Sequence, residues 1–306
     1  MTKKIIVTYI SNSRDIKGVL LLNYNLIKLK SSYSLGCIIT EEVSSRIKAL
    51  LKKFNIQIFS VSMKDILSKY NISDQHKKLI TDKHLFGKFC IFNLINYDTV
   101  LYLDTDILLL HNIDHLLEKK VTKKKIWMVA DTQATSDYNS IIIVKDRFNS
   151  GVIILRPSLE IFNDCFQLLC DEGSELFNKD LFLSDQYIFE KLYKQNKLEI
   201  SCLELCYNVH PILVESINKY KLMKKIYILH YMVKPKPWTL HDLEVDHTFE
   251  NNTCMDLFKL WLNLYNEMIE TTYFKQNKTT NISGYKRGYY DNNKLVVNNK
   301  LITNLD

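Results

Sequence analysis

Residues 5–40 read IIVTYISNSRDIKGVLLLNYNLIKLKSSYSLGCIIT, and a strand pattern, a helix pattern and a second strand pattern follow one another along them. The run Ile5–Ile10 is rich in β-branched residues and predicts a buried strand. Asp15–Lys30 carries apolar residues at helical spacing, and Gly36–Thr40 predicts the next strand. This succession is typical of an α/β unit.

The same alternation continues along the chain. Glu41–Phe54 predicts a second helix, and Ile56–Val61 predicts a third strand. Further strands are predicted at 99–103, 126–130, 151–155 and 226–229, and further helices at 158–169, 184–193 and 257–269. We therefore expect an α/β fold with a mainly parallel sheet, whose ligands bind beyond the carboxyl ends of the strands.

The composition favours one continuous domain. Of 306 residues, 46% are hydrophobic, and only 7 Gly and 4 Pro occur, so no flexible linker marks a boundary. We predict a single domain over residues 1–272 and a polar tail over residues 273–306. The net charge of +7 comes from Lys scattered among acids, which is typical of ordinary surface and gives no reason to expect nucleic-acid binding.

The cysteines and the hydrophobic runs indicate the compartment. The 7 Cys are irregularly spaced, and Cys202 and Cys206 have no His at zinc-ligand spacing, so we expect free, mostly buried thiols. The first residues show no signal-peptide pattern, and no run approaches the roughly 20 apolar residues of a membrane-spanning helix. We predict a cytoplasmic protein without a transmembrane segment.

The strongest chemical signal is Leu101-Tyr102-Leu103-Asp104-Thr105-Asp106, an apolar strand that ends in two acids. At the end of a strand, side chains two residues apart project to the same side, and two adjacent carboxylates are best satisfied by a shared cation. Oxygen ligands suit Mn²⁺ or Mg²⁺. The alternative for the pair alone is a polar loop or a cap of the next segment.

Three further segments add polar groups near predicted strand and helix ends. Phe148–Gly151 precedes a predicted strand and offers an amide and a hydroxyl. Ser184–Gln186 opens a predicted helix, where backbone N–H groups converge with an acid. His230–Trp238 follows a predicted strand and offers an imidazole as a third metal ligand and Lys236 as a cation for a phosphate.

Together these motifs resemble the glycogenin-like members of glycosyltransferase family 8. The similarity covers residues 3–240, in order and at the spacing of that family. It is carried by Val7–Asn12, Lys17-Gly18, Lys88, Leu103–Asp106, Phe148–Gly151, Asp185-Gln186, Tyr207-Asn208 and His230–Trp238. The resemblance implies a single Rossmann-like domain of the GT-A type and retaining transfer of a hexose, glucose first, from a UDP-sugar. It also makes a homodimer reasonable.

The resemblance implies a role for each matching residue. Asp104, Asp106 and His230 would bind Mn²⁺ or Mg²⁺, which bridges the donor diphosphate. The remaining donor-site residues would be Tyr9, Ser11 and Asn12 beside the uridine, Thr105 between the acids, Lys88 and Lys236 at the phosphates or sugar, and Asn149, Ser150, Asp185 and Gln186 around the transferred sugar. Lys88, Asp185 and Gln186 would be catalytic, and whether Asp185 is a nucleophile or an orienting group stays open.

The chain departs from the family pattern at three places. Val233 stands where the family usually has Gly, and Phe182 stands where glycogenins carry a further acid. Glu215 occupies the position of the tyrosine that glycogenins glucosylate on their own chain, and Tyr220 is displaced from it. We therefore expect a separate acceptor, which is a glycan, a protein or a lipid-linked sugar.

Two other functions compete with this interpretation. The strand-end acids also resemble those of haloacid-dehalogenase-like phosphatases, but such enzymes place the nucleophilic Asp on the first strand, whereas this pair follows several α/β units. The second alternative is a self-glycosylating or non-catalytic protein that binds nucleotide-sugars, and it draws support from Val233 and Phe182.

Overall fold

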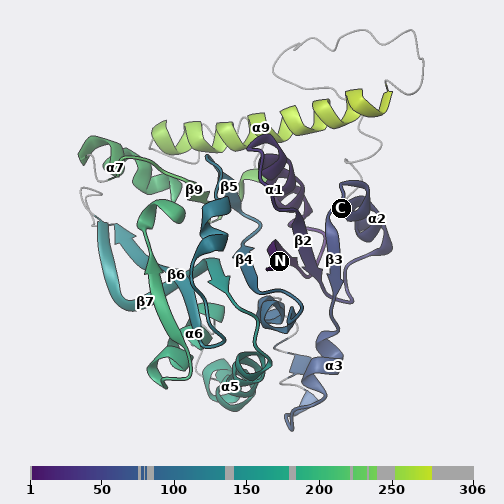
Figure 1. Ribbon diagram of the computed structural model, residues 1–306, viewed down its shortest axis with the longest axis vertical. Coiled ribbons are helices and arrows are strands. Elements are labelled where there is room, and N and C mark those ends of the chain that lie inside the picture. Colours follow the sequence, from purple (N-terminus) through teal and green to yellow (C-terminus); the bar gives the residue numbers. More distant parts are fainter. Residues whose placement is uncertain are drawn as a thin grey trace.

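A seven-stranded sheet forms the centre of the computed structural model, in the order β3-β2-β1-β4-β7-β6-β8 (Figure 1). The structure describes residues 2–74, 77–78, 80, 86–134, 141–178, 184–220, 223–232, 234–239 and 252–277. Its strands are β1 (Lys4–Ile10), β2 (Leu35–Ile39), β3 (Gln57–Ser60), β4 (Thr99–Leu103), β5 (Ile107–Leu109), β6 (Lys125–Ala134), β7 (Ile141–Leu155), β8 (Glu199–Leu203) and β9 (Ile228–His230).

The α-helices lie between these strands in the chain. They are α1 (Ile16–Lys28), α2 (Ser45–Lys53), α3 (Met63–Leu67), α5 (Leu159–Asn178), α6 (Asp185–Lys194), α7 (Val214–Tyr220) and α9 (Asn252–Asn277). Short 3-10 helices include η1 (Phe86–Asn93), η2 (Asp114–Glu118), η3 (Leu205–Tyr207), η4 (Pro211–Leu213) and η5 (Pro237–Thr239). No helix in these described ranges is both long enough and apolar enough to cross a membrane.

Most neighbouring strands of the main sheet are parallel. β1 pairs in parallel with β2 and β4, β2 with β3, and β6 with β8. Only β7 runs antiparallel to its neighbours β4 and β6. The predicted α/β class with a mainly parallel sheet is therefore confirmed.

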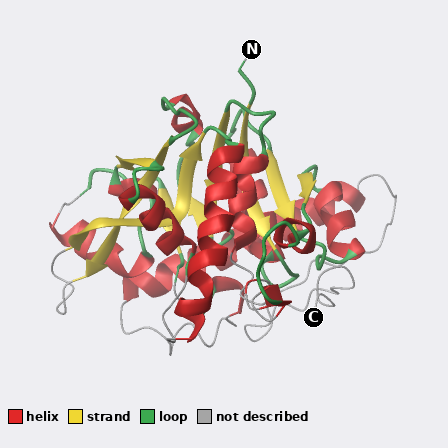
Figure 2. Cartoon of the chain, turned by 90° about the horizontal axis from the view of Figure 1, so that it is seen from below, coloured by secondary structure: helices red, strands yellow, loops and turns green. Residues whose placement is uncertain are grey.

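Both faces of the sheet are covered, because alternate residues of each strand point to opposite faces. Ile6 and Leu101 belong to a hydrophobic cluster that includes residues of α1, α2 and α9. Val7 and Tyr102 belong to a second cluster with residues of η1, α5 and α6. Figure 1 shows α1 and α9 on one side of the sheet and α5 on the other, and in Figure 2 the strands run between the helices.

A small second sheet, formed by β5 and β9, brings β9 next to the acid pair. β5 begins directly after Asp106 and pairs antiparallel with β9, so that Ile107 lies opposite His230. The backbone N–H of Tyr231 donates to the carbonyl oxygen of Asp106 over 2.9 Å. This pairing fixes where the imidazole of His230 lies.

The predicted strand and helix boundaries were wrong in several places. β5 and β8 were not predicted, and β7 begins at Ile141 rather than at Gly151, so Asn149 and Ser150 lie inside a strand instead of before one. The first part of β7 pairs only with β6 and carries charged, exposed residues, which hides the period-two pattern of a half-buried strand. The last helix is also longer than predicted.

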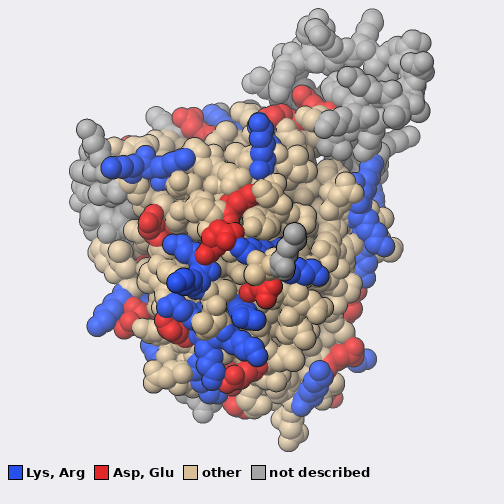
Figure 3. Space-filling view, in the orientation of Figure 1, with Lys and Arg blue, Asp and Glu red and all other residues tan. Residues whose placement is uncertain are grey.

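The state of the cysteines and the distribution of charged side chains on the surface agree with what the composition predicts. All seven Cys are free, and only Cys202 is exposed. On the face seen in Figure 3, Lys and Arg side chains are interspersed with Asp and Glu.

Candidate active site

All of the site residues named from the sequence line one cleft of about 330 Å³. The cleft lies where β1 and β4 end, and β7, β9 and the start of α6 supply its other walls. Gly18 lets α1 approach this edge closely, because a Cβ there would lie 2.2 Å from the carbonyl oxygen of Thr105. The fold thus gathers at one place residues that are far apart in the sequence.

Two carboxylates and one imidazole converge in the cleft. The Nε2 atom of His230 lies 3.1 Å from Oδ1 of Asp106 and 3.7 Å from Oδ2 of Asp104. One ligand atom from each of these residues lies within 4.8 Å of the other two. Asp106 and His230 are buried, so the groups face one another in a partly dry site.

Asn208 orients the imidazole of His230. The Oδ1 atom of Asn208 lies 2.8 Å from Nδ1 of His230, and both residues are buried. Because an amide oxygen only accepts, Nδ1 donates to Asn208, and Nε2 is the ring nitrogen that faces the acids. Such a partner fixes both the ring orientation and the tautomer of a metal-binding histidine.

Gly151 leaves the space that the imidazole occupies. A Cβ on Gly151 would lie 2.2 Å from Cε1 and 2.6 Å from Nδ1 of His230. The backbone N–H of Gly151 donates to Oδ1 of Asn149 over 2.9 Å. Asn149 therefore shapes the wall behind the imidazole, and glycine is required at position 151 by a close contact.

Asp106 is held in its ionised form. Burial alone would raise its pKa, but His230 and Lys236 outweigh burial and hold the pKa well below its usual range. The Nζ atom of Lys236 lies 2.5 Å from Oδ2 of Asp106 and donates over 2.8 Å to the carbonyl oxygen of Tyr231. Lys236 and His230 thus both contact the carboxylate of Asp106.

Lys88 connects the acid pair to the opposite wall of the cleft. Its Nζ atom lies 3.0 Å from Asp104 and 2.5 Å from Asp185, and it donates to Oγ of Ser150 over 3.2 Å. Burial opposes the charged form of Lys88, but Asp104 and Asp185 raise its pKa above the usual value. Tyr102 donates to Oδ1 of Asp104 over 2.6 Å and completes this network.

Asp185 is the first residue of α6, one residue after the predicted start of that helix at Ser184. Ser184 caps the helix by accepting from the backbone N–H of Tyr187. The Oδ2 atom of Asp185 also accepts from Oγ of Ser150 over 2.7 Å. Burial would raise the pKa of Asp185, yet Lys88 and these hydrogen bonds lower it, so the carboxylate stays charged inside the cleft.

The comparisons with known proteins decide the family. The family model described as Glycosyl transferase family 8 matches residues 7–241, which is well over half of the chain. This chain belongs to glycosyl transferase family 8. The match agrees with the predicted resemblance and favours glycosyl transfer over the phosphatase alternative.

Relatives of this family 8 protein cover most of its length. The uncharacterized protein R707 of Acanthamoeba polyphaga mimivirus is 23% identical over 270 residues, which cover 84% of this chain and 91% of the relative. Human glycogenin-1 is 24% identical over 281 residues, which cover 87% of this chain and 72% of the relative. Some relatives are longer, since the match covers only 50% of the glycogenin of Komagataella phaffii.

A solved structure shows the same fold. The crystal structure of the galactosyltransferase LgtC in complex with donor and acceptor sugar analogues has a TM-score of 0.56 to this chain. It is 14% identical in sequence, and the match covers 86% of this chain and 96% of LgtC. The predicted GT-A glycosyltransferase fold is therefore confirmed.

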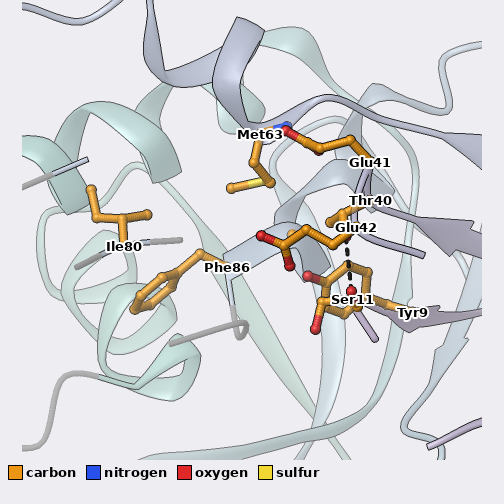
Figure 4. A pocket seen from close by; sticks show the side chains of 9 residues that line it. Tyr9, Ser11, Thr40, Glu41, Glu42, Met63, Ile80 and Phe86 are labelled. Atoms are coloured by element: carbon orange, nitrogen blue, oxygen red, sulfur yellow. Dashed lines mark hydrogen bonds between the residues drawn. The ribbon is translucent and has the colours of Figure 1, made fainter. Parts of the chain in front are cut away.

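A smaller pocket adjoins the main cleft of this family 8 protein (Figure 4). Tyr9 and Ser11 line both cavities, and the far wall of the smaller pocket includes Met63 and Phe86. Ser11 accepts through its backbone carbonyl from Oγ1 of Thr40 over 3.1 Å. The smaller pocket's volume of about 10 Å³ leaves room for about one water molecule, so it is a side pocket of the main cleft.

Asn12 has a local structural role. Its Oδ1 atom accepts from the backbone N–H of Arg14 over 2.9 Å, and its Nδ2 atom donates to Oγ of Ser11 over 3.3 Å. Asn12 thus stabilises the turn that leads from β1 to α1. This turn forms the edge between the smaller pocket and the main cleft.

The donor atoms at the acid pair fit a divalent ion. Two carboxylates and one imidazole, with Nε2 aimed at the acids, form a ligand set that suits Mn²⁺ and leaves coordination positions for oxygen atoms of a ligand. The buried, ionised state of Asp106 agrees with such a site. This family 8 protein therefore has a possible Asp-Asp-His metal site.

Reasoning from the sequence missed several residues of the site. Tyr207-Asn208 was recognised only as part of a motif, although Asn208 orients His230. Tyr102 and Gly151 were read as strand residues, although they contact Asp104 and His230. The departures at Val233 and Phe182 lie outside the described residues.

Proposed function

We propose that this family 8 protein is a retaining hexosyltransferase that uses a UDP-sugar, with UDP-glucose as the first candidate, and a divalent ion, Mn²⁺ or Mg²⁺. The convergence of Asp104, Asp106 and His230 carries the proposal, because these three groups offer a site for an ion that bridges a diphosphate. The acceptor in this proposal is a separate glycan, protein or lipid-linked sugar.

The leaving group sets the main chemical demand. When the bond between the sugar C1 and the diphosphate oxygen breaks, negative charge develops on the diphosphate, and preorganised cations lower the barrier. A bound divalent ion would supply Lewis acidity at that oxygen. Lys236 lies beside the acids, and its ammonium would supply a further positive charge for the phosphates.

The other wall of the cleft would hold the sugar. Asp185 and Gln186 line the cleft at the start of α6, and the pKa of Asp185 is lowered, so a negative charge faces the space for the sugar ring. That charge stabilises an oxocarbenium-like sugar in the transition state. Lys88 holds both Asp104 and Asp185, and in this role it fixes the distance between the metal side and the sugar side.

We assign Asp185 an orienting and electrostatic role rather than a nucleophilic one. Its Oδ2 atom is bonded to both Lys88 and Ser150, which reduces its nucleophilicity. A front-face reaction, in which the acceptor hydroxyl enters on the side of the leaving diphosphate, needs no protein nucleophile. The uridine in this proposal lies in the main cleft, toward Tyr9 and Ser11.

A donor screen tests the proposal. The protein is incubated with Mn²⁺ and each of several UDP-hexoses and UDP-N-acetylhexosamines, with and without simple sugar acceptors, and the released UDP is measured. We expect UDP release with at least one donor and its loss in Asp104→Asn. Absence of release and of UDP binding with every donor would refute the proposal.

Mass spectrometry of the same reactions separates the alternatives. Sugar mass on an added acceptor supports transfer to a separate molecule, whereas sugar mass on the protein supports self-glycosylation. Donor binding without either product supports a non-catalytic binding protein.

The cytoplasmic location and the homodimer stay predictions, which fractionation and light scattering can check.

A further inference from the structure

Asp15 immediately precedes α1 and lines the cleft beside the acid pair, although the sequence motifs gave it no role. Aspartate is among the best residues for the position before a helix, because its carboxylate accepts from the first free N–H groups. The Asp15 side chain makes no such capping bond. Its carboxylate therefore keeps its hydrogen-bonding capacity for other groups.

The carboxylate of Asp15 also lacks another partner within the described part of the chain. No hydrogen bond or ion pair joins it to a described residue, and its pKa is raised by burial and by the charges of Asp106 and Asp104, against the opposing charge of Lys236. The two cleft lysines are engaged elsewhere, since Lys236 bonds Asp106 and Lys88 bonds Asp104 and Asp185. A partly buried acid without a bonded cation therefore lines the same cleft as two further acids.

The charges of the side chains that line the cleft indicate which ligand would suit Asp15. Among the described residues, four acids line the cleft, and the two lysines that line it, Lys88 and Lys236, compensate two of their charges. One divalent cation would neutralise the two remaining charges. Asp15 supplies one of these two, so it raises the attraction of the nucleotide-free cleft for such an ion.

Asp15 does not belong to the group of direct ligands. The three residues whose ligand atoms gather within 4.8 Å are Asp104, Asp106 and His230. A six-coordinate Mn²⁺ or Mg²⁺ bound by three protein groups keeps water at its other positions until a phosphate replaces it. A carboxylate next to these positions can accept hydrogen bonds from that water.

We propose that Asp15 is a positioning residue of the metal site, which holds the water shell of the ion and allows the ion to bind before the nucleotide. This inference rests on the proposed metal-dependent function. Binding of a ribose hydroxyl by Asp15 is the less favoured role, because the acids that act most on Asp15 are the metal ligands.

Titration with Mn²⁺ in the absence of nucleotide tests the inference, with free Mn²⁺ followed by electron paramagnetic resonance. We expect Asp15→Asn to weaken Mn²⁺ binding by about tenfold or more, the lower end of the range for a partner of metal ligands. Asp65→Asn removes the same charge from an exposed position on α3 and should leave the affinity within twofold. Unchanged Mn²⁺ affinity in Asp15→Asn would overturn the inference.

Two further measurements separate this inference from the proposed function. Asp104→Asn should abolish Mn²⁺ binding, and wild-type affinity in that variant would mean that the proposed metal site itself is wrong. UDP affinity at saturating Mn²⁺ should change little in Asp15→Asn. A large loss of UDP affinity there, together with normal binding of Mn²⁺ alone, would assign Asp15 to the ribose and refute the metal role.

Discussion

Gly151→Ala should remove activity by displacing one side chain while the fold persists. The added Cβ would lie 2.2 Å from Cε1 of His230, and ordinary contacts begin at 3.4 Å, so the imidazole must retreat by the difference of 1.2 Å. The position has no left-handed backbone, so alanine causes no strain beyond this contact. The perturbation therefore falls mainly on the ring of His230 and its hydrogen bond to Asn208, and Oδ1 of Asn149, at 3.0 Å from the added Cβ, is the next closest atom.

The size of the effect follows from this displacement. Moving a positioned group by about 1 Å can cost roughly 100-fold in rate. The change also breaks the alignment that Asn208 provides, and losing such a partner typically costs about 10–100-fold in metal affinity. Overpacking costs about 1–3 kcal/mol of stability, which leaves most domains folded.

Gly36→Ala is the matched control. Gly36 also lies in a strand of the main sheet, and a Cβ there would lie 2.6 Å from Cε2 of Phe59, away from the cleft. Both variants should lose similar stability in urea unfolding, but only Gly151→Ala should lose Mn²⁺ affinity and UDP release. Mn²⁺ affinity and UDP release within threefold of wild type in Gly151→Ala would refute the placement of His230 at the metal.

Three other changes test separate parts of the site. Asp106→Asn, or EDTA added to the wild type, should lower the transfer rate by at least ~100-fold, because a preorganised charge is lost. Full activity in either case would contradict the metal assignment. Lys236→Ala should lower the transfer rate by roughly 100- to 1000-fold and weaken the binding of UDP, which calorimetry can measure. Unchanged UDP affinity would count against a contact between Lys236 and the phosphates. Burial, with smaller effects from His230 and Lys236, lowers the pKa of His210 from 6.5 to about 4. Below pH 6.5 His210 is protonated in the unfolded chain, whereas in the folded protein it stays neutral until about pH 4. The free energy of unfolding should therefore decrease as the pH falls through this window, by up to about 3 kcal/mol. His210→Asn should remove that part of the pH dependence in urea unfolding, and an unchanged difference between pH 7 and pH 5 would contradict it.

Local sequence patterns gave part of the fold correctly. The strand 99–103 and the acids that follow it were predicted in place, because a buried strand that ends in two carboxylates is a strong local signal. The start of α6 was predicted to within one residue, and the structure shows that Ser184, where the predicted helix began, is the cap of that helix.

The missed strands have a common cause. β8 shows mixed burial and was not predicted, although it pairs with β6 along its whole length. β5 has only three residues and follows the acid pair, so no periodicity can develop there. The existence of such strands depends on their neighbours in the sheet rather than on their own composition.

The sequence by itself determined the α/β class, the residue types of the site and the resemblance to family 8, because side-chain periods and short motifs are local properties. Only the tertiary structure decided that Lys236 lies against Asp106, which is 130 residues away, and that Asn208 aims the imidazole of His230. It also left Asp15 in the same cleft as the acid pair without a partner among the described residues. These contacts depend on strand order and register, and no local pattern contains that information, since it arises only when the β5–β9 pair and the main sheet come together.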